Sequence, residues 1–239
     1  MFQTIDSLKQ LSQGRLEAPQ RPADAGLTPQ MVLLRSWQME RLTQTHADLL
    51  ASERYGLACR FFLSDLYAPQ DFTLRDQGFQ KLYHSLQRFL PPPLLGILRD
   101  AIDLNDLTRD LDDKLLAVLV DELGMTDILT SQMYAEAYRR CDNYDDRVRQ
   151  IEMLVEVGRK IDGIVRLPFI GLALRLAHTP AHRAGWGPVQ DFLERGYAAF
   201  KQMKDADEFL EIIHEREMQI LEQIFRRCPV ARKTSELEL

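Results

Sequence analysis

Two predicted helices of this sequence carry a histidine and a glutamate on the side where apolar residues gather. In residues 208–225, a helical period of about 100° per residue gives an apolar face of Leu210, Ile213, Ile220, Leu221 and Ile224. Glu217 falls close to the centre of this face, and His214 lies on its flank. Glu211 completes a Glu-x-x-His spacing with His214 but points well away. The inward pair of this helix is therefore His214 and Glu217.

The first long helical segment shows a similar arrangement. Over residues 31–53 the apolar face is formed by Met31, Val32, Met39, Leu42, Leu49 and Leu50. Arg35, His46 and Glu53 share that face. If this segment packs against the last helix, two imidazoles and two carboxylates meet in the interior. Imidazole and carboxylate groups are ligands for zinc, iron or manganese.

These inward groups have more than one interpretation. An isolated buried carboxylate is costly, so we expect Glu217 to be satisfied by His214, Arg35, His46 or Glu53. One interpretation is a structural ion-pair network closed by Arg35. Another is a site for a metal ion or small molecule, although a di-iron centre would require a second Glu-x-x-His motif, which the sequence lacks. A different helix rotation would remove the pairing. The first two interpretations predict that the first long helix and the last helix pack together with these polar groups facing.

A second histidine pair, His178 and His182, has the four-residue spacing of two ligands on one helix face. Pro180 lies between them and disfavours a continuous helix. No third ligand is near in the sequence, so we interpret them as histidines of a surface loop over residues 177–188.

The segments that must position these groups begin with Thr28-Pro29, an N-cap followed by proline at the first helical position. From there to Pro69 the only breaker is Gly56. A single helix of this length would be unusual in a globular domain, so we expect a bend near residues 51–56.

The stretch FFLSDLY, residues 61–67, closes this segment with large apolar side chains on both sides of the helix. We predict that Phe62 and Leu66 are buried core residues. Asp65 is expected to be partly exposed or paired with an arginine, and the alternative is a polar group that lines a pocket. Residues 71–76 carry capping residues and start a new helix.

Two stretches, FFLSDLYAPQDFTLRD at residues 61–76 and QDFLERGYAAFKQM at residues 190–203, resemble a family of bacterial helical proteins of unknown function. The likeness spans most of the chain after about residue 28. The resemblance implies a helical fold, and it implies no activity and no catalytic residue.

Cap and stop signals along the chain predict an all-α protein, and no alternating strand pattern occurs. We expect a multi-helix, orthogonal or bundle-like single domain of about eight to ten helices, with residues 1–27 as an N-terminal helix and surface linker, residues 28–228 as the domain and residues 229–239 as a polar tail. The later helices are predicted at about 74–89, 93–103, 105–123, 126–141, 144–165, 168–178, 188–203 and 207–227.

Composition narrows the partners and the compartment. The net charge of −6 gives no basis for binding nucleic acid or an anionic membrane. Cys59, Cys141 and Cys228 form no CxxC pair, which favours free thiols and the cytoplasm. No secretory signal opens the sequence. The most apolar stretch, residues 164–177, is too short and too interrupted to span a membrane, and we interpret it as core.

Two functions remain. The absence of Walker, G-x-G-x-x-G and G-x-S-x-G motifs favours a non-enzymatic helical protein that acts through protein–protein or homo-oligomer contacts. The alternative is a bundle that binds a metal ion or small ligand through its inward histidines and glutamates, with oxidoreductase chemistry as one possibility. No other cofactor is expected.

Overall fold

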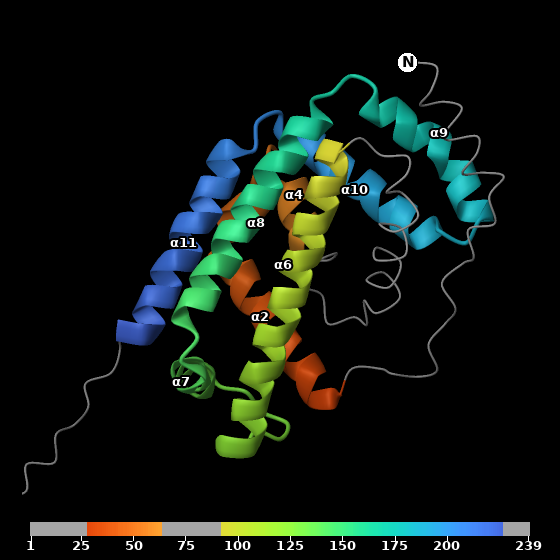
Figure 1. Ribbon diagram of the computed structural model, residues 1–239. Helices are drawn as coiled ribbons and strands as arrows, with labels where there is room; N and C mark the ends of the chain where they lie inside the picture. Colours follow the sequence, from red (N-terminus) through yellow and green to blue (C-terminus); the bar gives the residue numbers. More distant parts are fainter. Residues whose placement is uncertain (1–27, 64–91, 227–239) are drawn as a thin grey trace, which may run out of the picture.

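The computed structural model describes residues 28–63 and 92–226, and all regular structure in these two ranges is helical (Figure 1). The prediction of an all-α domain with about eight to ten helices is therefore confirmed. The described elements are α2 (Pro29–Thr45), α3 (Ala47–Ala51), α4 (Gly56–Phe61), α6 (Pro92–Ala117), the π-helical turn η2 (Val118–Glu122), α7 (Ser131–Cys141), α8 (Tyr144–Val165), α9 (Ile170–Arg183), α10 (Gly187–Met203) and α11 (Asp207–Arg226). The predictions for residues 1–27, Asp65, Leu66, residues 71–89 and Cys228 lie outside the described residues.

The first helical segment begins as predicted and bends where expected. The Thr28 hydroxyl accepts a hydrogen bond from the Met31 amide at 3.2 Å, and Pro29 opens α2. The helix is interrupted at His46 and again over residues 52–55. Gly56 then begins α4, and a Cβ atom there would lie 2.7 Å from the Leu50 carbonyl oxygen. Only glycine allows this close approach of the two backbones.

The two helices predicted at 93–103 and 105–123 are wrong as separate elements, because α6 runs without a break through Asn105 and Asp106. Asparagine and aspartate have only a weak preference against helix interiors, and packing along α8 outweighs it. The stop at Gly124 is confirmed by its φ of +67°. The cap predicted at Thr126 is also wrong. Thr130 is the N-cap of α7, and its hydroxyl accepts a hydrogen bond from the Met133 amide.

The loop predicted over residues 177–188 is largely helix, because α9 continues through Pro180 to Arg183. A proline inside a helix removes one backbone hydrogen bond, a loss that packing can offset. Here α9 lies along α10, and the buried Gln190 amide donates to the Leu174 carbonyl at 2.9 Å.

The helices pack around two groups of buried apolar side chains. One lies between α4, α8, α10 and α11 and includes Phe61, Phe200 and Phe209. The other lies between α2, α6, η2 and α7. Phe62 is only partly buried, so the prediction that it is a buried residue is wrong. Phe61 occupies the buried position, and the Phe62 ring packs against Phe200 and Phe209.

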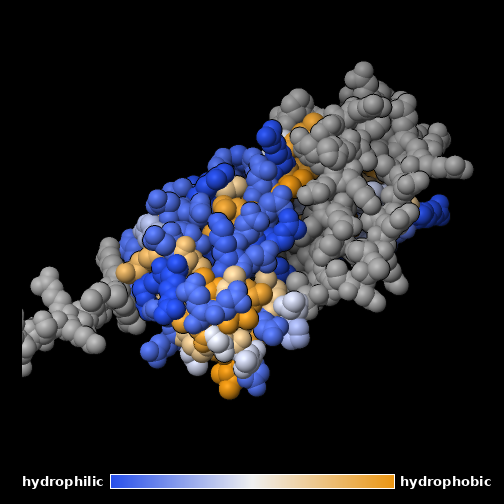
Figure 2. All heavy atoms as spheres, turned by 60° about the horizontal axis from the view of Figure 1, so that its bottom comes forward, coloured by the Kyte–Doolittle hydropathy of each residue, from blue (hydrophilic) through white to orange (hydrophobic). Residues whose placement is uncertain are grey.

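The arrangement of the helices separates two ends of the molecule. In Figure 1, α11, α8 and α6 run side by side with α2 and α4 behind them, while α9 and α10 stand apart from α7. On the face seen in Figure 2, hydrophilic side chains cover most of the described surface and small groups of apolar side chains lie between them.

The stretch at residues 164–177, interpreted from the sequence as core, lies at the surface instead. No residue of α9 is buried, and Leu167, Phe169, Leu172 and Leu176 are exposed. Within the described residues, α9 packs mainly along α10 and touches α8 to a smaller extent. Within the described ranges, no helix is both long enough and apolar enough to cross a membrane.

Candidate functional site

Between the two apolar groups lies a partly open cavity of about 110 Å³ lined by residues of α2, α4, α6, α7, α8 and α11. One side of the lining is apolar, with Phe209, Ile213 and Leu221 among its members. The polar members come from five helices and their adjoining residues: Gln38, Arg41, His46, Thr108, Asp112, Tyr134, Tyr138, Arg147, Gln150 and Glu217. An apolar pocket with several polar groups is the usual form of a ligand-binding site, so this cavity is the candidate functional site.

Glu217 is the most closely held acid of the cavity. The guanidinium of Arg41 donates two hydrogen bonds to the Glu217 carboxylate, from Nη1 to Oε1 at 3.1 Å and from Nη2 to Oε2 at 2.9 Å. The His46 Nε2 atom lies 3.1 Å from the same Oε1. The predicted contact between the first long helical segment and the last helix, through His46 and Glu217, is therefore confirmed.

Charge and burial act in opposite directions on this group. Burial alone would raise the pKa of Glu217, but the hydrogen bond to His46 and the charge and hydrogen bonds of Arg41 outweigh it and lower the pKa from 4.5 to about 2. Burial alone would likewise lower the pKa of Arg41, and the charge of Glu217 raises it instead. The pair is thus ionised throughout the physiological range, as the structural interpretation requires.

The remaining predicted residues of this cluster lie elsewhere. Arg35 is half-buried on α2, where its charge acts on Asp112 rather than closing the Glu217 network. Glu53 is exposed in the turn between α3 and α4, and its backbone carbonyl accepts a hydrogen bond from Gln202. His214 is half-buried on α11. The predicted closure by Arg35 is wrong, because Arg41 fills that role.

Arg41 was not among the predicted residues, because only residues on the apolar face of the helix were considered as partners of Glu217. Arg41 precedes the buried Leu42 and follows the buried Gln38 by three residues, which places it on the flank of the face. A long arginine side chain extends its charge inward from a flank. The signal that pointed to it was the requirement of the central Glu217 for a cation.

A second polar network lies on the α6 and α8 side of the cavity. The Gln38 side-chain amide donates to Asp112 Oδ1 at 3.0 Å. Burial raises the pKa of Asp112, against the opposing effects of that hydrogen bond and of the Arg147 and Arg35 charges. Arg147 donates through Nη2 to the Leu111 carbonyl and through Nη1 to Gln150, both at 3.1 Å.

Aromatic rings complete the wall. Tyr134 stacks on Trp37 with ring centroids 4.1 Å apart, and Tyr138 lies 4.8 Å from Tyr134. The guanidinium of Arg147 sits 4.5 Å above the Tyr138 ring, an arrangement that stabilises a cation.

Three nitrogen atoms of cavity residues have no hydrogen-bond partner within the part of the chain that the structure describes. They are Arg41 Nε, His46 Nδ1 and Arg147 Nε, and all three are buried. A buried nitrogen without a partner costs about 1–3 kcal/mol, so each is a position where a bound polar group would stabilise the protein. His46 Nε2 donates to the ionised Glu217, so Nδ1 of the neutral imidazole accepts a hydrogen bond and donates one only in the imidazolium form. The two arginine atoms are obligatory donors, since an arginine side chain has no acceptor.

The other predicted histidines, His178 and His182, are distant in the fold from this cavity. They lie on α9 and face α10, where Asp191 approaches within reach of both. The interpretation of these residues as loop histidines without a third ligand is therefore wrong, because the helix through Pro180 aligns them toward a neighbouring helix.

Comparison with known proteins identifies a family for this chain. A family model described as a domain of unknown function, DUF8198, matches residues 17–231. The chain belongs to the DUF8198 family. This agrees with the resemblance seen in the sequence. No curated protein and no solved structure matches the chain. Membership of this family identifies no activity.

Proposed function

We propose that the cavity binds a small organic molecule that carries a carboxylate or a similar acceptor-rich anionic group. The observation that carries this proposal is that three buried nitrogens without a partner in the described chain, Arg41 Nε, His46 Nδ1 and Arg147 Nε, belong to residues that line one cavity. Two of them are donors in every protonation state. A group with two acceptor oxygens would satisfy these two arginine donors together.

The charge balance of the cavity supports an anion. Glu217 already neutralises Arg41 through two hydrogen bonds. The carboxylate whose charge acts on Arg147 is that of Asp112, and burial raises the pKa of that carboxyl group. The positive charge of Arg147 is therefore the less completely balanced of the two, and a bound carboxylate would compensate it.

The same features argue against the metal alternative at this cluster. Both oxygens of Glu217 are engaged by a guanidinium, and that positive charge repels a cation. The structural interpretation of the Glu217 network and ligand binding in the adjoining cavity are compatible, because the network leaves the three nitrogens unsatisfied.

The size of the cavity limits the ligand. A cavity of about 150 Å³ accommodates benzene in another protein. A volume near 110 Å³ therefore suits a compact molecule of a few heavy atoms, such as a short-chain or branched carboxylic acid. The apolar wall would accept its hydrocarbon part, and the aromatic wall beside Arg147 would exclude water from its charged end.

The test is a calorimetric and thermal-shift comparison of short carboxylic acids with their uncharged amides. We expect at least one acid to bind and its amide to bind at least tenfold more weakly. Arg147→Lys keeps the charge but removes Nε, and it should weaken acid binding at least tenfold. Arg159→Lys, on the exposed side of the same helix, is the matched control and should leave binding unchanged. Equal binding of acid and amide, or an unaffected Arg147→Lys protein with native circular dichroism, would refute the proposal.

A second candidate is a homo-oligomer formed through α9, in line with the expectation of protein–protein contacts. It is supported by Leu167, Phe169, Leu172 and Leu176, four large apolar side chains exposed within ten residues. Light scattering across a range of protein concentrations should show a concentration-dependent mass. Phe169→Glu should abolish it, whereas Ile128→Glu, at an exposed isoleucine before α7, should not. A constant monomer mass in the unmodified protein would contradict this candidate.

The cytoplasm remains the proposed compartment. Cys59 and Cys141 are free thiols, and burial raises the pKa of Cys59 to about 11. Such a thiol is unreactive at neutral pH. Intact-protein mass spectrometry without reductant should show no mass loss from a disulfide.

A further inference from the structure

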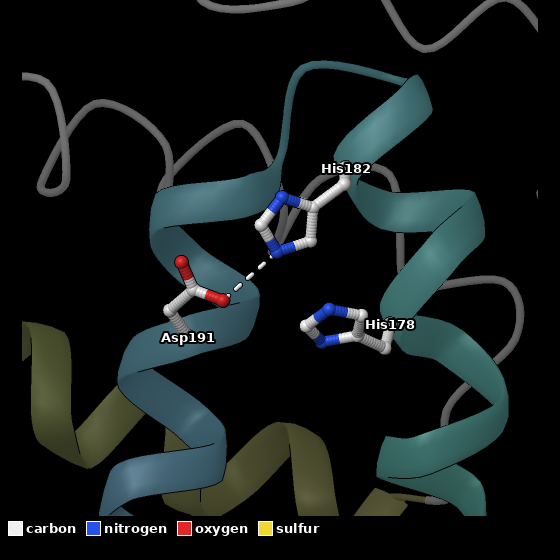
Figure 3. A group of neighbouring side chains, drawn as sticks. All are labelled: His178, His182 and Asp191. Atoms are coloured by element: carbon white, nitrogen blue, oxygen red, sulfur yellow. Dashed lines mark hydrogen bonds and ion pairs between the residues drawn. The ribbon is translucent and has the colours of Figure 1, made fainter.

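The exposed end of the molecule formed by α9 and α10 brings together two histidines and two carboxylates. His178 and His182 are one turn apart on α9, and their ring centroids lie 4.5 Å from one another. Asp191 approaches from α10, with Oδ1 2.8 Å from His182 Nε2 (Figure 3). One ligand atom each from these three residues lies within 4.8 Å of the others.

A fourth ligand adjoins this group. Glu194 follows Asp191 by three residues on α10, and its Oε1 lies 2.9 Å from His178 Nδ1. Each imidazole is thus paired with one carboxylate of the opposite helix. Both carboxylates arise from one face of α10 and both imidazoles from one face of α9. Ligand atoms of His178, His182 and Asp191 lie within 4.8 Å of one another, and Glu194 adjoins them through its contact with His178.

Residues around the group hold it in place. Gln190 is buried and donates through Nε2 to Glu194 Oε1 at 2.8 Å and to the Leu174 carbonyl at 2.9 Å. This hydrogen bond is the main reason that the pKa of Glu194 is lowered. The carboxylate is therefore both oriented and kept ionised by its own helix, as ligand carboxylates in metal sites commonly are.

Gly187 provides a second, independent constraint. A Cβ atom at this position would lie 2.7 Å from Nδ1 and 2.9 Å from Cε1 of the His182 ring. The imidazole therefore lies against the backbone at the start of α10, in space that only glycine leaves open. This contact directs Nε2 toward Asp191.

We propose that His178, His182, Asp191 and Glu194 bind a divalent transition-metal ion, with zinc as the ion that best suits the ligands. Imidazole nitrogens and carboxylate oxygens are both ligands of zinc, and four of them supply the tetrahedral coordination number that this ion prefers. Metal–ligand distances of about 2.0–2.2 Å place tetrahedral ligand atoms about 3.4 Å apart. The ligand atoms of His178, His182 and Asp191 lie within 4.8 Å of one another, and a rotation of the Glu194 side chain would bring the fourth ligand to them.

The ion would hold α9 onto α10. No residue of α9 is buried, and Pro180 interrupts its hydrogen bonding, so this helix has little apolar anchorage of its own. Four protein ligands leave no open position for a substrate, which is typical of structural rather than catalytic zinc. The proposal is independent of ligand binding in the cavity, because the two groups of residues lie in different parts of the fold.

The test begins with protein purified without a histidine tag and freed of metal with a chelator. Calorimetric titration with zinc chloride should show one equivalent bound with a dissociation constant in the micromolar range or below. Titration with Co²⁺ should produce the intense visible absorption of a four-coordinate ion. Zinc should also raise the melting temperature, since an ion that binds only the folded state stabilises it.

Variants locate the site. His182→Gln and Asp191→Asn should each weaken zinc binding at least tenfold and reduce the Co²⁺ absorption. Gly187→Ala should weaken binding by displacing the His182 ring. His214→Gln removes a half-buried histidine on α11 and is the matched control, so it should bind as the unmodified protein does.

Each outcome is informative because the ligand side chains are partly exposed and their loss should leave the fold intact. Circular dichroism checks this for every variant. Failure of the unmodified protein to bind zinc at millimolar concentration would overturn the proposal. Equal binding by His182→Gln, Asp191→Asn and His214→Gln would also overturn it.

Discussion

The cluster around Glu217 and the cluster around Asp191 contain the same functional groups in opposite surroundings. In the interior, one carboxylate is shared by His46 and Arg41. At the surface, two carboxylates face two imidazoles, and the side chains of His182 and Asp191 are each 41% exposed. Residue type alone therefore does not distinguish a structural ion pair from a candidate metal site.

The Arg41 guanidinium is what distinguishes the interior cluster from the surface cluster. In the interior it supplies a permanent positive charge that fully occupies Glu217, which makes the group a stabilising element and disfavours a cation. At the surface, Asp191 and Glu194 accept hydrogen bonds from neutral or ionisable groups that a metal ion can displace. Burial strengthens the first arrangement, and exposure gives an ion access to the second.

The largest expected effect is the loss of the interior carboxylate. Glu217→Gln leaves the Arg41 charge buried without a counterion and should lower the free energy of unfolding by about 3–5 kcal/mol. The measurement is urea denaturation followed by circular dichroism. Glu211→Gln on the same helix removes an exposed partner of Arg159 and should cost less than about 1 kcal/mol. Equal costs would show that Glu217 is no more than a surface charge.

Acid should destabilise the interior cluster in a defined window. The folded pKa of Glu217 is lowered from 4.5 to about 2, so its stabilisation is complete above pH 4.5 and is lost as the pH falls toward 2. A shift of this size corresponds to about 3 kcal/mol. Asp112 acts with the opposite sign, because its raised pKa favours the folded state as the pH falls.

Urea denaturation between pH 5 and pH 2 measures this dependence. Glu217→Gln should reduce the slope, since glutamine does not titrate, while the exposed Asp48, whose pKa is lowered by its hydrogen bond to Arg216, keeps its own smaller share. Retention of the full slope in Glu217→Gln would assign the acid sensitivity to other carboxylates.

The interior contact was predictable from the sequence because Glu217 lies at the centre of an apolar face and must be satisfied. That requirement selects a cationic or imidazole partner on whichever helix packs opposite, and His46 fits it. The identity of the arginine did not follow from the pattern. The helix wheel places Cβ atoms, whereas Arg41 reaches the cavity through a side chain long enough to bypass its own position.

The surface group was missed for a different reason. A proline within a helix was expected to break it, and the packing of α9 along α10 preserved it instead. The short turn at residues 184–186, with Gly185 at a φ of +81°, folds the two helices back on one another. Pairs placed nearly symmetrically about this turn then meet, as His182 does with Asp191 and His178 with Glu194.

A smaller effect is the direct coupling between His46 and Glu217. A double-mutant cycle of His46→Gln and Glu217→Gln should show an interaction of about 1–2 kcal/mol, because the two side chains share one hydrogen bond in a buried place. The measurement is the free energy of unfolding of the four proteins. Full additivity would mean that Arg41 alone satisfies the glutamate.

The smallest expected effect comes from the surface pair in metal-free protein, and it completes the comparison. His182→Gln removes the same hydrogen-bond type as His46→Gln, but both partners are exposed, so the free energy of unfolding should change by less than about 0.5 kcal/mol. With saturating zinc, the unmodified protein should gain stability that His182→Gln lacks, since only a complete site binds the ion. Thermal unfolding with and without zinc measures both quantities. A large loss of unfolding free energy in metal-free His182→Gln would show that the surface pair is a structural element like the interior one. An equal stabilisation of both proteins by zinc would show that the ion binds elsewhere.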